Sequence, residues 1–353
     1  MSERTEANSG TREAAGALDE GALEAWLREH VEGYRGPLTV RQFKGGQSNP
    51  TFQLLTPDRA YVLRRKPPGP LLPGAHAVER EHRVIAALHG AGFPVARPYA
   101  LCDDPAVIGT PFYVMDMVEG RIFWEAHLPE VPGAERAAHF DAMNEAIARL
   151  HLLDPAAIGL ADYGKPGDYF ARQIGRWSKQ YSADEAAGRV PAMDRLAEWL
   201  PLAAPPDEAP RIIHGDFRAD NMIFHPTEPR VLAVLDWELS TLGHPLADFA
   251  YHLMMYRMPA GLTTGLAGRD LAAEGIPSEA AYVDAYCRRT RRDGIPNLDW
   301  LLAFNMFRLA AIVHGIKGRI VRGTAASPHA AAMASQLEPL ADLAWAQAVR
   351  AGA

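Results

Sequence analysis

The chain has 353 residues, of which 48% are hydrophobic and 22% are charged, and its formal net charge is -7. This composition is typical of a folded globular protein and excludes a disordered chain, while the negative charge disfavours a nucleic-acid binder. Two cysteines, Cys102 and Cys287, make no disulfide framework and show no metal-ligand spacing, so we expect a reducing, cytoplasmic environment.

The N-terminal region does not have the pattern of a signal peptide. Residues 1–16 lack the basic start and the apolar core of a signal peptide, and no apolar run approaches the length of a membrane span. We therefore expect a mobile tail over residues 1–17 and no membrane association. The first helix is predicted for residues 19–30, because apolar side chains recur there at helical spacing.

A glycine-containing turn follows this helix. Residues 38–43 and 51–55 alternate between apolar and polar side chains, which predicts a β-hairpin. The turn that joins them can bring backbone N–H groups close to phosphate oxygens, because glycine has no Cβ. The candidate phosphate-binding residues in this turn are Gly45, Gly46, Ser48 and Asn49. The alternative is an ordinary flexible hairpin loop.

The next two elements carry opposite charges. Residues 61–66 are predicted to form a strand with Arg64 and Lys66 on the same face. A cation on this face could hold the phosphates of a nucleotide. The helix predicted for residues 75–88 carries Glu79 and Glu81, and either carboxylate could anchor that cation. The alternative is a solvated charged helix face.

Two further strands are predicted for residues 93–100 and 111–117, and the second leads to Gly120. We place the boundary between two lobes here, at residues 18–117 and 118–353, since the chain is long for one compact core. The second lobe is predicted to be helical, with a long core helix over residues 135–152. A basic and aromatic helix is predicted for residues 168–181, and its cations, Arg172, Arg176 and Lys179, could face solvent or a substrate.

The stretch over residues 211–248 contains the residues best suited to chemistry. Two short apolar runs, residues 211–213 and 231–235, are predicted to be buried strands that hold a polar loop between them. Phosphoryl transfer requires a group that accepts the proton of a hydroxyl and oxygen ligands for Mg²⁺. Asp216 could accept the proton, and Asn221 and Asp236 could hold the metal. The alternative is that these side chains cap turns and end a strand.

Three nearby polar residues are predicted to support this loop. We expect His214 to make structural hydrogen bonds, and His151 to pack or to cap a helix. Asp248 stands at a predicted helix start and could cap it, but we favour a role in bracing the loop at residues 214–221.

The sequence resembles a known family in several segments. HGDFRADN at residues 214–221, followed by LDWE at 235–238, resembles the signature of the aminoglycoside phosphotransferase and choline kinase-like branch of the protein-kinase-like fold. VLRRKPPG and LLPGAHAVERE, at residues 62–69 and 71–81, resemble the kinase-like domain of acyl-CoA dehydrogenase family members ten and eleven. The resemblance covers most of residues 38–330. It implies an α+β, two-lobed protein-kinase-like fold with a small antiparallel sheet lobe and a larger helical lobe.

The resemblance also implies a nucleotide site with ATP and Mg²⁺ as cofactors. Arg64 and Glu81 would form the pair that steadies the phosphates, with Lys66 and Glu79 as the second choice for each position. Met115 would be the gatekeeper residue. The Asp116 carbonyl and the Val118 N–H would contact the adenine ring through the backbone.

The acceptor stays open at this point. The resemblance implies phosphorylation of a small-molecule hydroxyl, such as that of a hydroxyacyl-CoA, and the basic clusters at residues 288–292 and 317–322 would suit an anionic substrate. An aminoglycoside or another amino alcohol is the alternative acceptor. A nucleotide-binding pseudokinase that regulates a partner enzyme is the alternative from another functional class.

Overall fold

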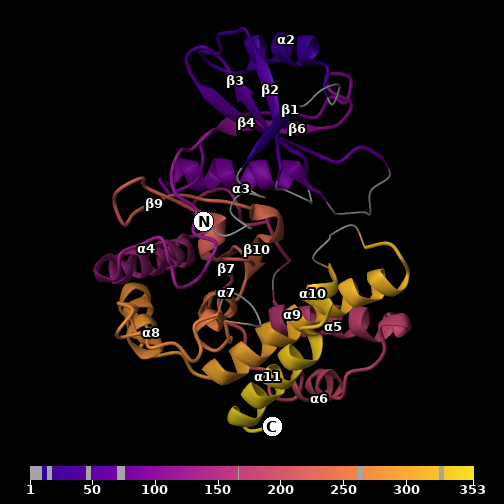
Figure 1. The fold of residues 1–353 in the computed structure, drawn as a ribbon, viewed down its shortest axis with the longest axis vertical. Coiled ribbons are helices and arrows are strands. Elements are labelled where there is room, and N and C mark those ends of the chain that lie inside the picture. Colours follow the sequence, from indigo (N-terminus) through magenta and orange to yellow (C-terminus); the bar gives the residue numbers. More distant parts are fainter. Residues whose placement is uncertain are drawn as a thin grey trace. The chain divides into compact units, whose positions relative to one another are not determined.

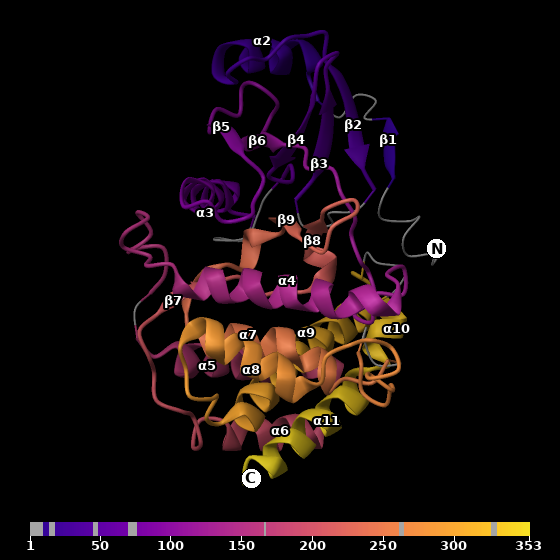
Figure 2. The same ribbon diagram turned by 90° about the vertical axis from the view of Figure 1, so that its left-hand side faces the viewer.

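The computed structural model describes residues 10–13, 18–44, 49–69, 76–165, 167–260, 265–325 and 330–353 (Figures 1 and 2). The chain divides into two compact units. Unit 1 comprises residues 1–124, 156–160 and 219–240, and unit 2 comprises residues 125–155, 161–218 and 241–353. Two segments from late in the chain thus belong to the first unit. Of the tail expected to be mobile, most residues lie outside the described part, and residues 11–13 form a short strand.

Unit 1 is built on a six-stranded antiparallel sheet with the order β1-β2-β3-β4-β6-β5. Its strands are β1 (Thr11–Glu13), β2 (Thr39–Phe43), β3 (Thr51–Leu55), β4 (Ala60–Arg65), β5 (Pro98–Cys102) and β6 (Phe112–Asp116). Two helices accompany the sheet, α2 (Glu20–His30) and α3 (Val78–Gly90). β1 was not predicted, and the strand predicted for residues 93–100 begins only at Pro98. The other elements agree with the sequence-based expectations to within a few residues.

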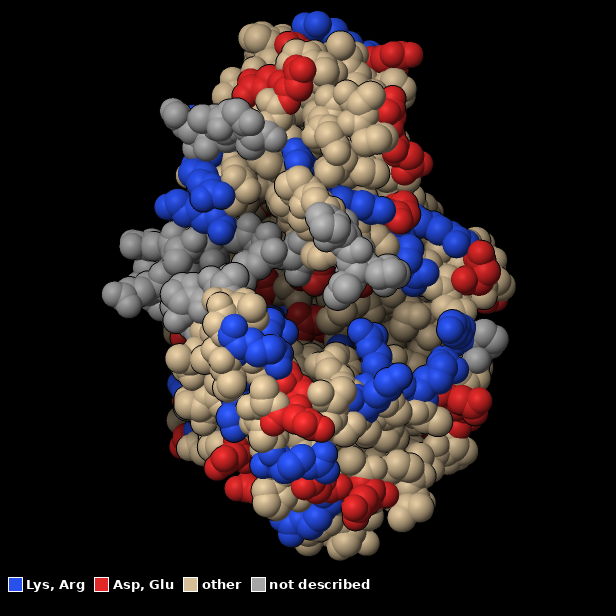
Figure 3. All heavy atoms as spheres, turned by 90° about the vertical axis from the view of Figure 1, so that its right-hand side faces the viewer, with Lys and Arg blue, Asp and Glu red and all other residues tan. Residues whose placement is uncertain are grey.

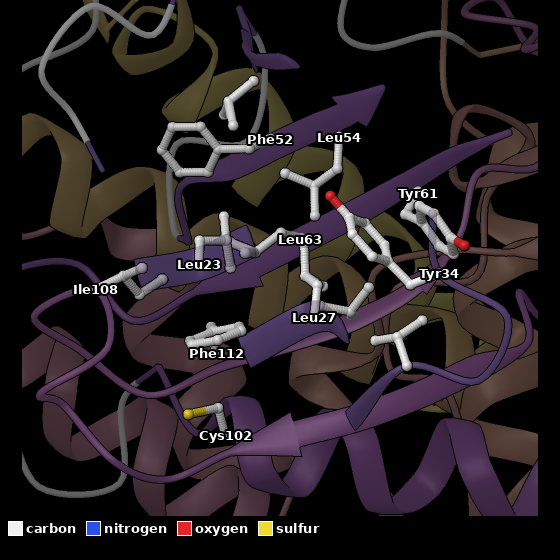
Figure 4. Close-up of a cluster of buried hydrophobic side chains, with 13 residues drawn as sticks. Leu23, Leu27, Tyr34, Phe52, Leu54, Tyr61, Leu63, Cys102, Ile108 and Phe112 are labelled. Carbon is white, nitrogen blue, oxygen red and sulfur yellow. The ribbon is translucent and has the colours of Figure 1, made fainter. Parts of the chain in front are cut away.

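Helix α2 covers one face of this sheet. The Asp19 side chain caps the helix by accepting a hydrogen bond of 2.9 Å from the Ala22 N–H. Leu23 and Leu27 then lie one turn apart and are fully buried against Leu54, Leu63 and other apolar side chains of the sheet, as Figure 4 shows. This apolar core holds β4 in place.

The alternation of β4 sends its other side chains to the opposite face. Tyr61 and Leu63 are buried in the core, whereas Arg64 points away from it and is paired in register with Tyr113 of β6. Helix α3 packs against β5 and β6, and its Glu81 is buried. The alternation predicted for residues 61–66 is therefore confirmed.

Each unit contains a small two-stranded sheet whose strands are close in sequence to the candidate catalytic loop. β7 (Arg211–Ile213) pairs with β10 (Thr241–Gly243), and β8 (Met222–Phe224) pairs with β9 (Val231–Val234). The two predicted strands are confirmed as β7 and β9. However, each pairs with a three-residue strand that was not predicted.

Unit 2 is mainly helical. Its α-helices are α4 (Gly133–Leu152), α5 (Tyr169–Ala183), α6 (Pro191–Trp199), α7 (Pro245–Leu253), α8 (Glu279–Thr290), α9 (Leu298–Val321), α10 (Ala330–Ala334) and α11 (Leu337–Arg350). Helix α9 is central, because it packs against α5, α7, α10 and α11. The core helices predicted for residues 135–152 and 168–181 are confirmed as α4 and α5.

The expectation that no apolar run approaches span length needs correction at α9. Among the described residues this helix alone is long and apolar enough to cross a membrane. Its apolar stretch is mostly buried inside the protein, which is the behaviour of a core helix in a water-soluble domain. Its hydropathy therefore reflects burial on all sides.

Candidate active site

In unit 1, Arg64 is the centre of a cluster of charged side chains. Its Nε lies 2.8 Å from Glu81 Oε2, and its Nη2 lies 2.8 Å from Asp236 Oδ1 and 3.4 Å from Glu238 Oε2. Only 13% of the Arg64 side chain is exposed. One guanidinium thus faces three carboxylates, so the cluster carries an excess of negative charge that can attract a cation.

Glu81 accepts hydrogen bonds from two neutral donors in addition to its contact with the Arg64 guanidinium. The Asn49 amide donates to Oε1 at 2.8 Å, and the Tyr113 hydroxyl donates to Oε2 at 3.1 Å. Burial raises the pKa of the Glu81 carboxyl to about 7, against the opposing effect of the Arg64 cation, and the charges of Asp236 and Glu238 add to the rise. Tyr113 was not predicted, because a buried tyrosine on a strand resembles any other core residue.

The structure brings Asn221 and Asp236 to the same end of the β8–β9 hairpin. Asn221 directly precedes β8, and its backbone carbonyl accepts a hydrogen bond of 2.8 Å from the Leu235 N–H. Asp236 is the next residue and has a φ of 62°, in the left-handed region. A residue other than glycine is rare in this conformation, and such strain gathers at functional sites.

The two alternative ion pairs of the sequence analysis both form. Lys66 Nζ lies 2.9 Å from Glu79 Oε2, and 45% of the Glu79 side chain is exposed. The Arg64–Glu81 pair is buried, and Arg64 also contacts the partly exposed Asp236. The buried pair is therefore the one associated with a predicted metal ligand.

The structure leaves most of the glycine turn undescribed. Gly45, Gly46 and Ser48 lie outside the described residues. Asn49 is fully buried, and its side chain contacts Glu81 and His76, whose Nδ1 lies 3.0 Å from Asn49 Oδ1. The Asn49 amide thus contacts the Arg64 cluster through Glu81. The composition of the turn did not predict this contact.

The predicted adenine-binding residues lie at the end of β6. Met115 is paired in register with Val62, and Asp116 Oδ1 accepts a hydrogen bond of 2.5 Å from the Tyr99 hydroxyl. The Val118 N–H makes no backbone hydrogen bond to any described residue. A Cβ at Gly120 would lie 2.2 Å from the Phe224 carbonyl oxygen, so only glycine fits there.

In unit 2, Asp248 braces the loop that carries Asp216. The backbone N–H groups of His214 and Gly215 each donate to the Asp248 carboxylate at 2.8 Å, and His151 Nε2 lies 3.2 Å from it. Burial alone would raise the pKa of Asp248, but the hydrogen bond and charge of His151 hold it below its ordinary value. The predicted bracing role of Asp248 is confirmed, and His151 is part of the same brace.

Side chains of unit 2 that contact Asp216 include those of Tyr251 and Arg218. The Tyr251 hydroxyl donates to Asp216 Oδ1 at 2.5 Å, and Arg218 Nε lies 3.1 Å from the same oxygen. Arg308 donates to the Gly215 carbonyl at 2.5 Å. Tyr251 and Arg308 were not predicted, although an arginine within the apolar sequence of α9 is a signal that could have been noticed.

The basic clusters are partly neutralised within unit 2. Arg289 pairs with Asp141, Arg292 with Glu208, and Arg322 with Asp184. These arginines stabilise contacts between helices and loops. Their presence is therefore weaker evidence for an anionic substrate than the sequence indicated.

Comparison with known proteins identifies the family. A model of the phosphotransferase enzyme family matches residues 39–301. The chain is 48% identical over 334 residues to acyl-CoA dehydrogenase family member 11 of Gallus gallus, covering 92% of this chain and 43% of that protein. It is 43% identical over 339 residues to family member 10 of Mus musculus, covering 95% of this chain and 32% of that protein. The chain thus spans less than half the length of these relatives.

Solved structures agree with this result. A crystal structure from Ralstonia eutropha, named as a candidate aminoglycoside phosphotransferase, is 52% identical with a TM-score of 0.87, and the match covers 94% of this chain and 99% of that one. Spectinomycin phosphotransferase in complex with ADP and spectinomycin is 11% identical with a TM-score of 0.61, over 93% of this chain and 98% of that one, and shows the fold alone. The expected α+β, two-lobed protein-kinase-like fold is confirmed. The chain therefore belongs to the phosphotransferase enzyme family.

Proposed function

We propose that this protein transfers the γ-phosphoryl group of ATP to the hydroxyl of a small molecule in the presence of Mg²⁺. The observation that carries the proposal is the buried Arg64 cluster of unit 1, where one cation joins Glu81 to Asp236. Phosphoryl transfer depends on positioning and on neutralising charge. A fixed cation that contacts Asp236, a predicted metal ligand, suits that task.

The candidate site residues have separate roles in this proposed reaction. Arg64 holds the α- and β-phosphates, and Glu81, with Asn49 and Tyr113, keeps Arg64 in place. The backbone of residues 116–118 holds the adenine ring. The turn predicted to contact the phosphates includes Gly45, Gly46 and Ser48, which lie outside the described residues. Asp216 accepts the proton of the acceptor hydroxyl as that oxygen attacks the γ-phosphorus, and ADP leaves.

The residues present fit a magnesium ion. No group of three or more His, Cys, Asp or Glu residues in the described part of the chain forms a complete metal site. Mg²⁺ does not need one, since it is usually bound by one or two carboxylates together with substrate phosphates and water. Asp236 and the side-chain oxygen of Asn221 would hold it, and the bound ion would neutralise phosphate charge.

Calorimetric titration with ATP, with and without Mg²⁺, tests the nucleotide part of this proposal. Asp236→Ala should abolish the Mg²⁺-dependent part of ATP binding, whereas Glu228→Gln, which removes an exposed carboxylate of the same unit, should leave it unchanged. In the same titration Arg64→Gln should weaken ATP binding by more than tenfold, because a buried charged contact to phosphate is lost. If Lys66→Gln has this effect and Arg64→Gln does not, Lys66 is the phosphate-binding cation.

The acceptor is proposed to be an anionic alcohol, in particular a hydroxyacyl-CoA. The relatives named as acyl-CoA dehydrogenases favour this choice. Helix α5 also presents Arg176 and Lys179, both exposed and neither paired with a carboxylate among the described residues. The second candidate is an aminoglycoside, favoured by the name of the Ralstonia protein. A cytoplasmic location, where ATP is available, is part of the same proposal.

A further inference from the structure

Helix α7 carries a second buried polar side chain one turn after Asp248. His252 is 3% exposed and lies four residues after Asp248, so the two side chains extend from the same face of the helix. Both ring nitrogens of His252 have a partner. Nδ1 lies 3.2 Å from the Phe217 carbonyl oxygen, and Nε2 lies 2.6 Å from the Tyr282 hydroxyl. His252 therefore contacts the backbone of the residue that directly follows Asp216.

The partners of His252 determine which ring nitrogen carries the proton. A backbone carbonyl can only accept a hydrogen bond, so Nδ1 donates to Phe217. Burial lowers the pKa of the His252 imidazole to about 4, whereas the hydrogen bond to Phe217 and the charge of Asp248 oppose this fall. The ring is thus neutral near pH 7, and Nε2 accepts from Tyr282, whose pKa burial raises well above its ordinary value. The hydrogen bonds therefore run in one direction, from Tyr282 through His252 to Phe217.

This contact adds to the brace on the other side of Asp216. The hydrogen bonds from Asp248 and Arg308 fall on the two residues that precede Asp216. The contact with His252 falls on the residue after it. Phe217 is also fully buried, and its ring centroid lies 5.3 Å from that of His252. The chain is therefore held by unit 2 both before and after the candidate base.

We propose that His252 is a positioning residue, which holds the Phe217 carbonyl and thereby keeps Asp216 in place for the acceptor hydroxyl. This inference rests on the proposed function. A displacement of about 1 Å at a reacting group can cost a hundredfold in rate. A hydrogen bond to the neighbouring peptide prevents such a displacement without any contact with the substrate. Its loss should therefore lower the rate of transfer and leave ATP binding unchanged.

Two conservative variants separate this hydrogen bond from the packing of the imidazole ring. The amide nitrogen of His252→Asn can take the place of Nδ1 and donate to Phe217. In His252→Gln the amide reaches the place of Nε2 instead, and the bond to Phe217 is lost. Both variants lose the ring, so a loss of packing alone should affect them similarly.

The probes are ATP with a 4-hydroxyacyl-CoA, an aminoglycoside or choline as acceptor. His252→Gln should lower kcat by roughly tenfold to a hundredfold, the cost of a displaced catalytic group. His252→Asn should keep kcat within about threefold of the wild type, and KM for ATP should stay within about twofold in both variants.

The matched control is His314→Asn. His314 on α9 is also buried, and its Nε2 lies 2.8 Å from the carbonyl oxygen of Gly188, outside the loop that carries Asp216. The shorter asparagine loses this bond, so the control should lose stability as His252→Gln does but keep the wild-type kcat. None of these variants replaces a Lys, Arg, Asp or Glu residue, so the charged surface shown for one face in Figure 3 stays the same. Thermal unfolding shows that each variant is folded at the temperature of the assay.

A readout independent of activity tests the direction of the hydrogen bonds. In protein labelled with ¹⁵N at the histidine rings, His252→Gln identifies the His252 signals, which should be those of a neutral ring protonated at Nδ1. A ring protonated at Nε2, a wild-type kcat in His252→Gln, or equal losses of kcat in His252→Asn and His252→Gln would show that the inference is wrong while the proposed function stands. If the wild-type protein phosphorylates none of the three acceptors, the proposed function fails, and this inference fails with it.

Discussion

At the scale of single residues, Glu81 has an unusual combination of burial and charge. It is 2% exposed, and it contacts Arg64, Asn49 and Tyr113. Its carboxyl nevertheless has a pKa raised to about 7 by burial. Its protonation state should therefore change in the neutral range, where ordinary glutamates are fully charged.

This property predicts a pH-dependent stability. The folded-state pKa of about 7 lies above the ordinary value of 4.5, so the folded protein binds more protons between these two values. The contribution of Glu81 is thus fully present below pH 4.5 and is lost as the pH rises through 7. The free energy of unfolding of the wild type, relative to Glu81→Gln, should fall on the order of 2 kcal/mol between pH 5 and pH 8.

Urea unfolding at pH 5, 6, 7 and 8 measures this difference, with Glu79→Gln as the control for removal of an exposed carboxylate from the same helix. A difference between the wild type and Glu81→Gln that is constant over this range would show that Glu81 stays charged when buried.

Sequence could name the candidate site residues, but it could not give their contacts. Asp216, Asn221 and Asp236 were selected because their spacing and chemistry suit phosphoryl transfer, and Arg64 because of a family resemblance. The sequence could not show that Tyr113 and Tyr251 donate to carboxylates. Such contacts depend on which side chains meet across 30 or more residues of chain, and periodicity gives no information about them.

At the scale of elements, the short segment from β10 to α7 supports the loop of Asp216. β10 pairs with β7, and α7 supplies Asp248 to the backbone after β7. Asp248→Asn keeps one acceptor oxygen, but its amide nitrogen cannot accept the second N–H. One buried donor therefore loses its partner, which costs about 1–3 kcal/mol.

Chemical denaturation measures the loss of stability in Asp248→Asn and in Asp141→Asn. The comparison distinguishes the bracing role of Asp248 from the effect of an ordinary ion pair. The Asp141 carboxylate is 59% exposed and pairs with Arg289, so its loss should cost less than about 1 kcal/mol. Equal losses of stability in the two variants would contradict the bracing role.

Sequence predicted the long elements better than the short ones. The hairpin of β2 and β3 and the helices α4 and α5 show clear periodicity, and the structure contains them. β1, β8 and β10 each have three residues, which is too short for an alternation to be recognised. β7 is equally short and was predicted from its apolar run instead. These strands exist because tertiary pairing stabilises them.

At the scale of the whole molecule, the chain combines a sheet-rich unit that carries the Arg64 cluster with a helical unit that carries Asp216. The division of the chain into two lobes could be expected from its length and from a family resemblance. The sequence could not predict that residues 219–240 belong to unit 1, because contacts between distant parts of the chain determine that assignment. Asn221 and Asp236 thus belong to the same unit as Arg64, whereas Asp216 belongs to the other.

The proposed reaction separates binding from chemistry along this division. Arg64, Asn221 and Asp236 would hold Mg²⁺ and ATP, whereas Asp216 would act only on the acceptor. Asp216→Ala should therefore bind ATP as the wild type does and yet be defective in transfer. A protein that only binds nucleotide to regulate a partner would show no such difference.

The most direct test of the proposed phosphotransferase activity is to measure transfer of the labelled γ-phosphoryl group of ATP to an alcohol. The rates of the wild type and of Asp216→Ala are compared. With a 4-hydroxyacyl-CoA, an aminoglycoside and choline as acceptors, the wild type should phosphorylate one of them only when Mg²⁺ is present. Asp216→Ala should lower that rate by roughly a hundredfold to ten-thousandfold. Wild-type rates in Asp216→Ala would contradict the role of Asp216, and tight ATP binding without a phosphorylated product from any acceptor would contradict the proposed phosphotransferase activity.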